Sequence, residues 1–214
     1  MRLEEALKLI VITDKKLKPN VVKAVEDALR GGATSIQLRL KESSTREMIE
    51  VGKAVRKLTE DFGALYFVDD RLDVALATNA DGIQLGPEDM PLDLAKSIAP
   101  NLIIGASVYS VEEAVEAERL GAHFLGAGSV YPTPSKPEAK VIGIEGLKEL
   151  VRRVRIPVVA IGGITHSNVK EVLTTGVCGI AVISAVMAAD DVESATRTLR
   201  ELIDEELKKR RGFS

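Results

Sequence analysis

Short apolar runs rich in β-branched residues alternate with longer amphipathic stretches along the whole chain. The apolar runs are continuous, which is typical of strands whose two faces are both covered. Between them, apolar residues recur every three or four positions, as at Val21, Val25 and Ala28, and this period indicates helices. Strands are predicted at residues 9–13, 34–39, 64–68, 81–85, 102–105, 122–126, 157–161 and 178–182.

Helices are predicted between these strands and after the last one. Strand–helix pairs in series imply a parallel sheet, and about eight such pairs close into a barrel. We therefore predict an α/β fold, a (β/α)8 TIM barrel. The predicted helices cover residues 19–30, 45–61, 71–78, 91–98, 111–120, 144–153, 166–174 and 191–209.

A recurring corner motif supports the barrel. Segments 32–36, 79–83, 121–125 and 176–180 each place Gly or Asn at a predicted helix end and then begin a strand. Glycine and asparagine adopt the left-handed conformation that closes the last helical turn. The repeat therefore marks helix-to-strand corners on one face of the barrel.

Composition limits the organisation and the class of protein. With 214 residues, 45% of them hydrophobic, and no stretch of linker composition, residues 1–214 are expected to form a single domain. The basic end at residues 208–214 is expected to fray. A net charge of −3 with interspersed signs argues against nucleic-acid binding. No run approaches a membrane span, and the lone Cys178 fits a reducing cytoplasm, so we expect a cytoplasmic protein without membrane partners.

The longest stretch without helical or strand period covers residues 126–143. Three prolines stiffen it, because each fixes φ and removes an N–H donor. Thr133, Ser135 and Lys136 stand among them, which predicts a loop that grips an anionic ligand. The alternative is an ordinary surface excursion, since long loops are functional or disordered.

Polar residues at the predicted strand ends carry the chemistry, because barrel active sites lie there. Alternation points Gln37, Arg39 and Lys41 to the same side of strand two. A guanidinium fork beside an ammonium suits a phosphate group. The alternative is that Arg39 and Lys41 pair with Glu42 or another acidic neighbour.

Carboxylates follow the third and fourth predicted strands, at Asp69, Asp70 and Asp89. Neighbouring strands lie about 5 Å apart, so carboxylates from both could meet over one cation. Oxygen ligands without histidine or thiolate suit Mg²⁺. The alternative is that these aspartates cap the helices that follow.

Later strand ends add hydroxyls and glycines. Ser107 is either a ligand hydroxyl or a helix cap. Gly162 and Gly163 allow backbone N–H groups to approach a phosphate, or serve only a tight turn. Ser184 follows the last strand, while His123 and His166 lie at positions that favour structural roles. Two anion sites in one mouth predict two phosphorylated small-molecule substrates, one of them a diphosphate accompanied by metal.

Five segments in this order resemble the thiamine-phosphate synthase family, and the resemblance covers essentially the whole chain. The segments are QLRLK at 37–41, DDRLDVA at 69–75, DGIQLGPED at 81–89, YPTPSK at 131–136 and AIGGI at 160–164. The resemblance implies a transferase that joins a hydroxymethylpyrimidine diphosphate to a carboxythiazole phosphate. The products would be thiamine phosphate, pyrophosphate and carbon dioxide.

The resemblance also implies roles for matching residues. Asp70 and Asp89 would hold one Mg²⁺ per site, and Arg39, Lys41, Lys136 and Ser107 would act in catalysis by a dissociative loss of pyrophosphate. The pyrimidine diphosphate would bind Gln37, Leu38, Arg39, Leu40, Lys41, Asp69, Ser107 and Lys136. The thiazole phosphate would bind Thr133, Pro134, Ser135, Gly163, Ile183 and Ser184.

Two positions depart from the family pattern. Asp69 stands where the family usually has asparagine, and Pro87 stands where a glutamine is common. A further negative charge near a diphosphate should weaken binding unless Asp69 is protonated, is paired with Arg71, or helps to bind metal. Pro87 is expected to be tolerated.

Two other functions remain open. A thiazole tautomerase of the same superfamily would share the barrel and the thiazole-phosphate site but would not need Arg39, Lys41 or the metal pair. A phosphate-binding barrel without turnover would bind ligand and form no product. The sequence does not determine whether the chains form a homo-oligomer.

Overall fold

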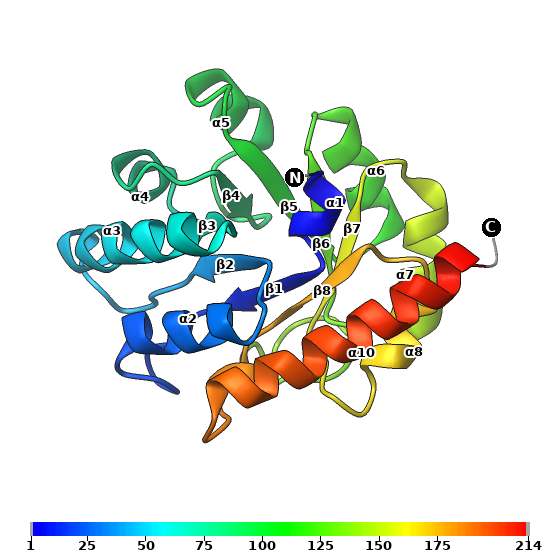
Figure 1. The fold of residues 1–214 in the computed structure, drawn as a ribbon. Coiled ribbons are helices and arrows are strands. Elements are labelled where there is room, and N and C mark those ends of the chain that lie inside the picture. Colours follow the sequence, from blue (N-terminus) through cyan, green and yellow to red (C-terminus); the bar gives the residue numbers. More distant parts are fainter. Residues whose placement is uncertain (1, 213–214) are drawn as a thin grey trace.

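Eight parallel strands close into a barrel in the computed structural model, which describes residues 2–212 (Figure 1). Each strand pairs with its neighbours in sequence, and β8 pairs with β1 to complete the ring. The predicted TIM barrel is confirmed. The strands are β1 (Leu9–Ile12), β2 (Ser35–Leu38), β3 (Leu65–Asp69), β4 (Gly82–Leu85), β5 (Ile103–Val108), β6 (Phe124–Ala127), β7 (Val158–Ile161) and β8 (Gly179–Val182).

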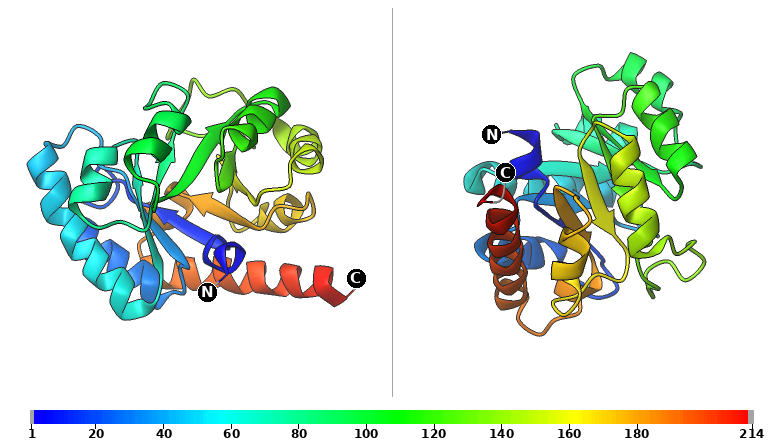
Figure 2. Two further views of the ribbon diagram at one scale, coloured as in Figure 1. Left: turned by 90° about the horizontal axis from the view of Figure 1, so that it is seen from above. Right: turned by 90° about the vertical axis from the view of Figure 1, so that its right-hand side faces the viewer.

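Helices surround the barrel on its outer side (Figure 2). The main ones are α2 (Val21–Arg30), α3 (Thr45–Phe62), α4 (Leu72–Ala77), α5 (Leu92–Ile98), α6 (Val111–Arg119), α7 (Gly143–Arg153), α8 (Val169–Leu173) and α10 (Val192–Gly212). The sequence pattern missed two single turns, α1 (Leu3–Ala6) and α9 (Ser184–Met187). Four residues are too few to show a helical period. No helix within residues 2–212 is long and apolar enough to cross a membrane.

The inside of the barrel is filled by a small apolar cluster separate from the outer core. Phe67 and Phe124 meet edge to face, with ring centroids 5.5 Å apart. Glycine at position 82 makes room for them, because a Cβ there would lie 2.6 Å from the Phe67 ring. This cluster occupies the barrel interior below the carboxyl ends of the strands.

The C-terminal segment differs from the expectation of a frayed end. Helix α10 continues to Gly212 and packs against α2 and α8. The Arg210 guanidinium donates hydrogen bonds to the carbonyl oxygens of Val177 at 2.7 Å and Gly176 at 3.2 Å. These bonds attach the end of α10 to the turn after α8. Residues 213 and 214, which were also expected to fray, lie outside the described residues.

Replacing Arg210 tests this attachment. We expect Arg210→Met to lower the free energy of unfolding by about 1 kcal/mol, because it removes charged hydrogen bonds to the Gly176 and Val177 carbonyls. Urea denaturation measures the change. Lys208→Met, an exposed position in the same turn of helix, should leave stability unchanged. Equal stability of both variants would contradict the attachment.

Candidate active site

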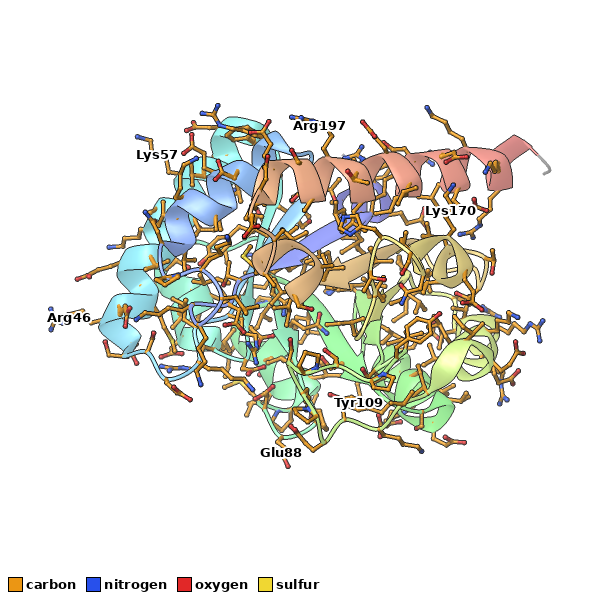
Figure 3. All side chains as sticks on the ribbon, turned by 90° about the horizontal axis from the view of Figure 1, so that it is seen from below. Arg46, Lys57, Glu88, Tyr109, Lys170 and Arg197 are labelled. Atoms are coloured by element: carbon orange, nitrogen blue, oxygen red, sulfur yellow. The ribbon has the colours of Figure 1, made fainter. Side chains whose placement is uncertain are left out.

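The carboxyl ends of the strands and the loops that follow them surround a cavity of about 710 Å³. Its floor is the apolar cluster, including Ile10, Phe124 and Val159, and its walls are mostly polar. Glu88 and Tyr109, which line it, lie along one edge of the molecule, and Arg197 lies along the opposite edge (Figure 3). The predicted strand-end residues therefore meet in one place.

Strand β2 and the residues that follow it bring Gln37, Arg39 and Lys41 to the cavity, as the alternation predicts. Leu38 and Leu40 face the other way and are buried in the core between the sheet and the helices. Their side chains therefore do not line the cavity, and the expected binding of the pyrimidine diphosphate by Leu38 and Leu40 stays a prediction that only their backbone could fulfil. The family segment 37–41 contains both faces of one strand, and only one face can reach the cavity.

Residues just after β1 hold both the backbone and the side chain of Arg39. The buried Thr13 hydroxyl accepts from the Arg39 N–H at 2.9 Å and donates to the Arg39 carbonyl at 3.0 Å. The Asp14 carboxylate receives the guanidinium at 3.3 Å, while its other oxygen accepts from the Lys16 N–H. Glu42, the expected alternative partner, pairs with Lys16 instead. Sequence reasoning missed both residues, although Thr13 ends the first predicted strand and Asp14 follows it.

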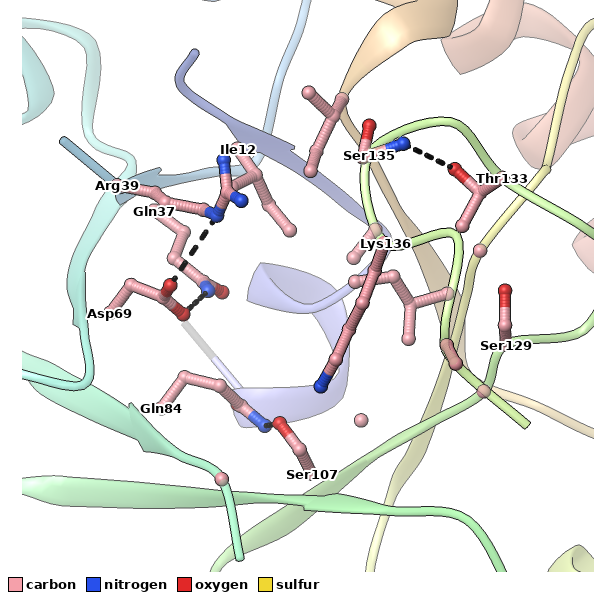
Figure 4. A pocket seen from close by; sticks show the side chains of 18 of the residues that line it. Ile12, Gln37, Arg39, Asp69, Gln84, Ser107, Ser129, Thr133, Ser135 and Lys136 are labelled. Carbon is pink, nitrogen blue, oxygen red and sulfur yellow. Dashed lines mark hydrogen bonds and ion pairs between the residues drawn. The ribbon is translucent and has the colours of Figure 1, made fainter. Parts of the chain in front are cut away.

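Asp69 lies between Gln37 and Arg39 (Figure 4). It accepts a hydrogen bond from Gln37 Nε2, and its Oδ2 is 3.8 Å from Arg39 Nε. Burial outweighs the charge of Arg39 and raises the pKa of Asp69 to about 6. Pairing with Arg71, one of the three expected options, is wrong, because the Arg71 guanidinium binds Asp73.

Asp70 and Asp89 face each other across the ends of β3 and β4. Asp70 has a left-handed backbone, φ 63°, which is uncommon for a residue other than glycine and is found at functional sites. Burial, and then the neighbouring carboxylates of Asp69 and Asp89, raise its pKa to about 7. Neither residue caps a helix: α4 and α5 have Arg71 and Pro91 at their N-caps. Asp89 accepts from the Gly86 N–H at 2.6 Å.

Strands β4 and β5 contribute a hydrogen-bonded amide and hydroxyl. Gln84 is 6% exposed and donates from Nε2 to Ser107 Oγ at 3.0 Å. Ser107 lies inside β5 and Ser110 caps α6, so the helix-cap alternative for Ser107 is wrong. Sequence reasoning missed Gln84. The alternation that identified Gln37 would also have found it, since it stands opposite Asp69 in the β3–β4 register.

The loop between β6 and α7 lines one side of the cavity. Thr133, Ser135 and Lys136 line the cavity, whereas Pro134 is exposed and does not. Lys136 extends inward toward Gln84 and Ser107 (Figure 4). Its Nζ donates to the Tyr109 hydroxyl at 2.9 Å. Sequence reasoning missed Tyr109, which lies on a different loop.

The turns after β7 and β8 form the remaining wall. Gly163, Ile183 and Ser184 line the cavity there, beside Gly162. Gly163 has φ 65°, and a Cβ on it would lie 2.6 Å from the Pro132 carbonyl oxygen. The glycine is therefore required by the close approach of the β6–α7 loop. Gly163 also lines the cavity, so its role in this close contact does not exclude the predicted phosphate contact.

The side chains best suited to nucleophilic or general-base chemistry lie elsewhere. His123 precedes β6, at the opposite end of the barrel from the cavity, and accepts a hydrogen bond from the Ile104 N–H. His166 is hydrogen-bonded to the Ala195 carbonyl. Burial raises the pKa of Cys178 to about 12. Within residues 2–212, the cavity thus combines cations, carboxylates, amides and hydroxyls without a histidine or a thiol.

The fixation of Arg39 can be tested at Thr13. Thr13→Val keeps the shape of a fully buried side chain but leaves the Arg39 N–H and C=O without their partner. We expect a loss of about 1–3 kcal/mol in the free energy of unfolding. Thr196→Val is the matched control, since that buried hydroxyl donates only to the Val192 carbonyl within α10. Calorimetric melting that ranks the two variants equally would contradict the special role of Thr13.

Comparison of the sequence with known proteins identifies the family. A model of the thiamine monophosphate synthase family matches residues 9–186. The chain is 65% identical over 207 residues to the thiamine-phosphate synthase of Pyrococcus horikoshii, covering 97% of this chain and 100% of the relative. It is 52% identical over 208 residues to the thiamine-phosphate synthase of Methanococcus maripaludis, with the same coverage.

A solved structure gives the same result. The thiamine phosphate pyrophosphorylase from Pyrococcus furiosus superposes with a TM-score of 0.93 at 63% identity, covering 96% of this chain and 100% of that chain. Sequence and structure thus agree over nearly the full length. The chain belongs to the thiamine monophosphate synthase family.

Proposed function

We propose that this barrel joins 4-amino-2-methyl-5-(diphosphooxymethyl)pyrimidine to carboxythiazole ethyl phosphate, giving thiamine phosphate, pyrophosphate and CO₂. One observation carries the proposal. A single cavity holds Arg39, Lys41 and Lys136 beside a pair of facing carboxylates, while glycine-rich turns with hydroxyls form another wall. Such a cavity suits a diphosphate on one side and a monophosphate on the other.

The diphosphate would lie among the three cations. Arg39 supplies a guanidinium whose backbone and head are both fixed, so little freedom is lost when it binds an anion. Lys41 and Lys136 supply ammonium groups from different loops. Gln37, Gln84 and Ser107 lie deeper, over the apolar floor, where a flat pyrimidine ring would fit.

Asp70 and Asp89 fit a divalent cation. Burial, and then the neighbouring carboxylates of Asp69 and Asp89, raise the pKa of Asp70, and a divalent cation between Asp70 and Asp89 would offset this repulsion. The described residues contain no group of three or more His, Cys, Asp or Glu side chains placed to hold a metal by themselves. A pair of carboxylates that relies on substrate phosphate for further ligands is typical of Mg²⁺. When bound, Mg²⁺ would neutralise charge on the diphosphate.

The thiazole phosphate would bind at the opposite wall. The loops after β7 and β8 and the short extra helix α9 form the recurrent phosphate site of TIM barrels. Here they present the backbone of Gly163 and Ile183 and the Ser184 hydroxyl. Thr133 and Ser135 face the same space from the β6–α7 loop. Pro134 would contribute only by stiffening this loop.

The residues of the cavity suit a dissociative substitution. The bond between the pyrimidine methylene carbon and the diphosphate oxygen breaks, and its electron pair leaves with pyrophosphate. The thiazole nitrogen then donates its lone pair to the methylene carbon, the carboxylate leaves as CO₂, and a proton takes its place. Arg39, Lys41 and Lys136 meet the charge that develops on pyrophosphate, which is usually the largest catalytic term. No nucleophile or histidine base is needed.

Coupled turnover tests the proposal. Purified protein with both substrates should form thiamine phosphate in the presence of Mg²⁺ and lose most activity when EDTA removes it, which chromatography of the product can follow. Exchange of a thiazole ring proton without product would favour the tautomerase. Binding of both ligands with neither reaction would leave a binding protein.

Asp69 gives a second test. Asp69→Asn removes a buried carboxylate beside the diphosphate cations while preserving its size, so the Michaelis constant for the diphosphate should stay the same or fall. Steady-state kinetics at several Mg²⁺ concentrations measures this. Asp73→Asn, which also frees an arginine but outside the cavity, is the control. A large loss of turnover with weaker dependence on Mg²⁺ would instead identify Asp69 as a metal ligand.

A further inference from the structure

Lys136 and Tyr109 come from two loops that meet over the cavity. Tyr109 follows β5, at the start of the β5–α6 loop, and Lys136 stands in the proline-rich loop between β6 and α7. Both side chains line the cavity. Since β5 and β6 are neighbours, the two loops rise side by side from the same part of the barrel.

Two contacts hold the lysine. Its Nζ donates a hydrogen bond of 2.9 Å to the Tyr109 hydroxyl, and the same Nζ lies 5.1 Å from the centroid of the Tyr109 ring. The first contact is polar and directional, whereas the second is an attraction between a cation and the negative face of the ring. One aromatic side chain thus limits both the direction and the distance of the ammonium.

No other charged group accounts for the position of the Lys136 ammonium. Glu138 and Glu88 act on it only at a distance, and among the described residues no carboxylate forms a salt bridge with Lys136. The flexible stem of a lysine would otherwise leave the ammonium free in solvent. Tyr109 is itself restrained, because its N–H donates to Glu113 Oε2 at 2.6 Å.

We propose that Tyr109 is a positioning residue, which holds the Lys136 ammonium over the cavity ready for the departing diphosphate. This role rests on the proposed function, because it matters only if Lys136 meets that charge. A group placed before the reaction needs no reorganisation when charge develops, and this is the source of its catalytic value. Tyr109 therefore acts through Lys136 and should have little effect without it.

A graded pair of substitutions separates the two contacts. Tyr109→Phe keeps the ring and loses the hydrogen bond, so kcat should fall about threefold, since the pair is partly exposed. Tyr109→Leu loses both contacts, and kcat should fall about tenfold. The Michaelis constant for the thiazole phosphate should not change in either variant, because that ligand would bind the opposite wall. Tyr131→Phe is the matched control: it removes the hydroxyl bonded to Glu171, outside the cavity.

A double-mutant cycle with Lys136→Met decides the question. If Tyr109 acts through the lysine, Tyr109→Leu should cause no further loss of kcat in the Lys136→Met background. An equal loss in both backgrounds would overturn the proposal. Thermal melting of each variant identifies any loss that comes from unfolding, and Tyr109→Phe keeps the test valid if the leucine variant is unstable.

Binding of inorganic pyrophosphate with Mg²⁺, measured by calorimetry, gives a readout independent of turnover. If Tyr109→Leu weakens pyrophosphate binding, and this effect is absent in the Lys136→Met background, the positioning role is supported. A wild-type protein that gave this result but made no thiamine phosphate would reject only the proposed function. Wild-type turnover together with unchanged kcat and unchanged pyrophosphate affinity in Tyr109→Leu would reject the positioning role alone.

Discussion

The parallel closure of the barrel is the constraint on which the site depends. Because all eight strands run in one direction, every strand end faces the same opening. Residues separated by more than a hundred positions, such as Arg39 and Ser184, therefore reach one cavity. The aromatic pair of Phe67 and Phe124 closes the axis below them. The depth of the cavity is thus set by packing, and its chemistry by the residues at the strand ends.

This arrangement brings many charged side chains to one cavity, and the structure pairs only some of them. The residues around the cavity include six carboxylates and four cations: Asp69, Asp70, Glu88, Asp89, Glu113 and Glu138, with Arg39, Lys41, Lys136 and Lys140. Burial makes each unpaired charge costly. Arg39 and Asp14 relieve one another, while Asp69 and Asp70 keep raised pKa values. A metal ion and a diphosphate that bind together would neutralise the carboxylates and the cations that remain unpaired.

The sequence predicted the barrel, its eight strands and most of the cavity wall, because strand ends and side-chain alternation follow simple periods. It could not predict groups whose role depends on contacts between distant segments. Thr13 looks like an ordinary strand residue until its hydroxyl is seen to bridge the backbone of Arg39. Helix α9 is too short to have a period. For Leu38 and Leu40, alternation directs the side chains away from the cavity, so the role that the family segment implies for them stays a prediction about their backbone.

The β6–α7 loop couples the two halves of the site. Thr133 and Ser135 face the space assigned to the thiazole phosphate, and Lys136, the next residue, reaches across toward Ser107. The loop is attached on both sides: Gly163 lets Tyr131 and Pro132 approach β7, and Tyr109 holds Lys136 from β5. A shift of this loop would therefore move a thiazole ligand group and a diphosphate ligand group together. In the proposed reaction the thiazole nitrogen must attack the reactive pyrimidine cation before water does. A short, stiff loop that contacts both substrates would keep them in the relative position that this attack requires.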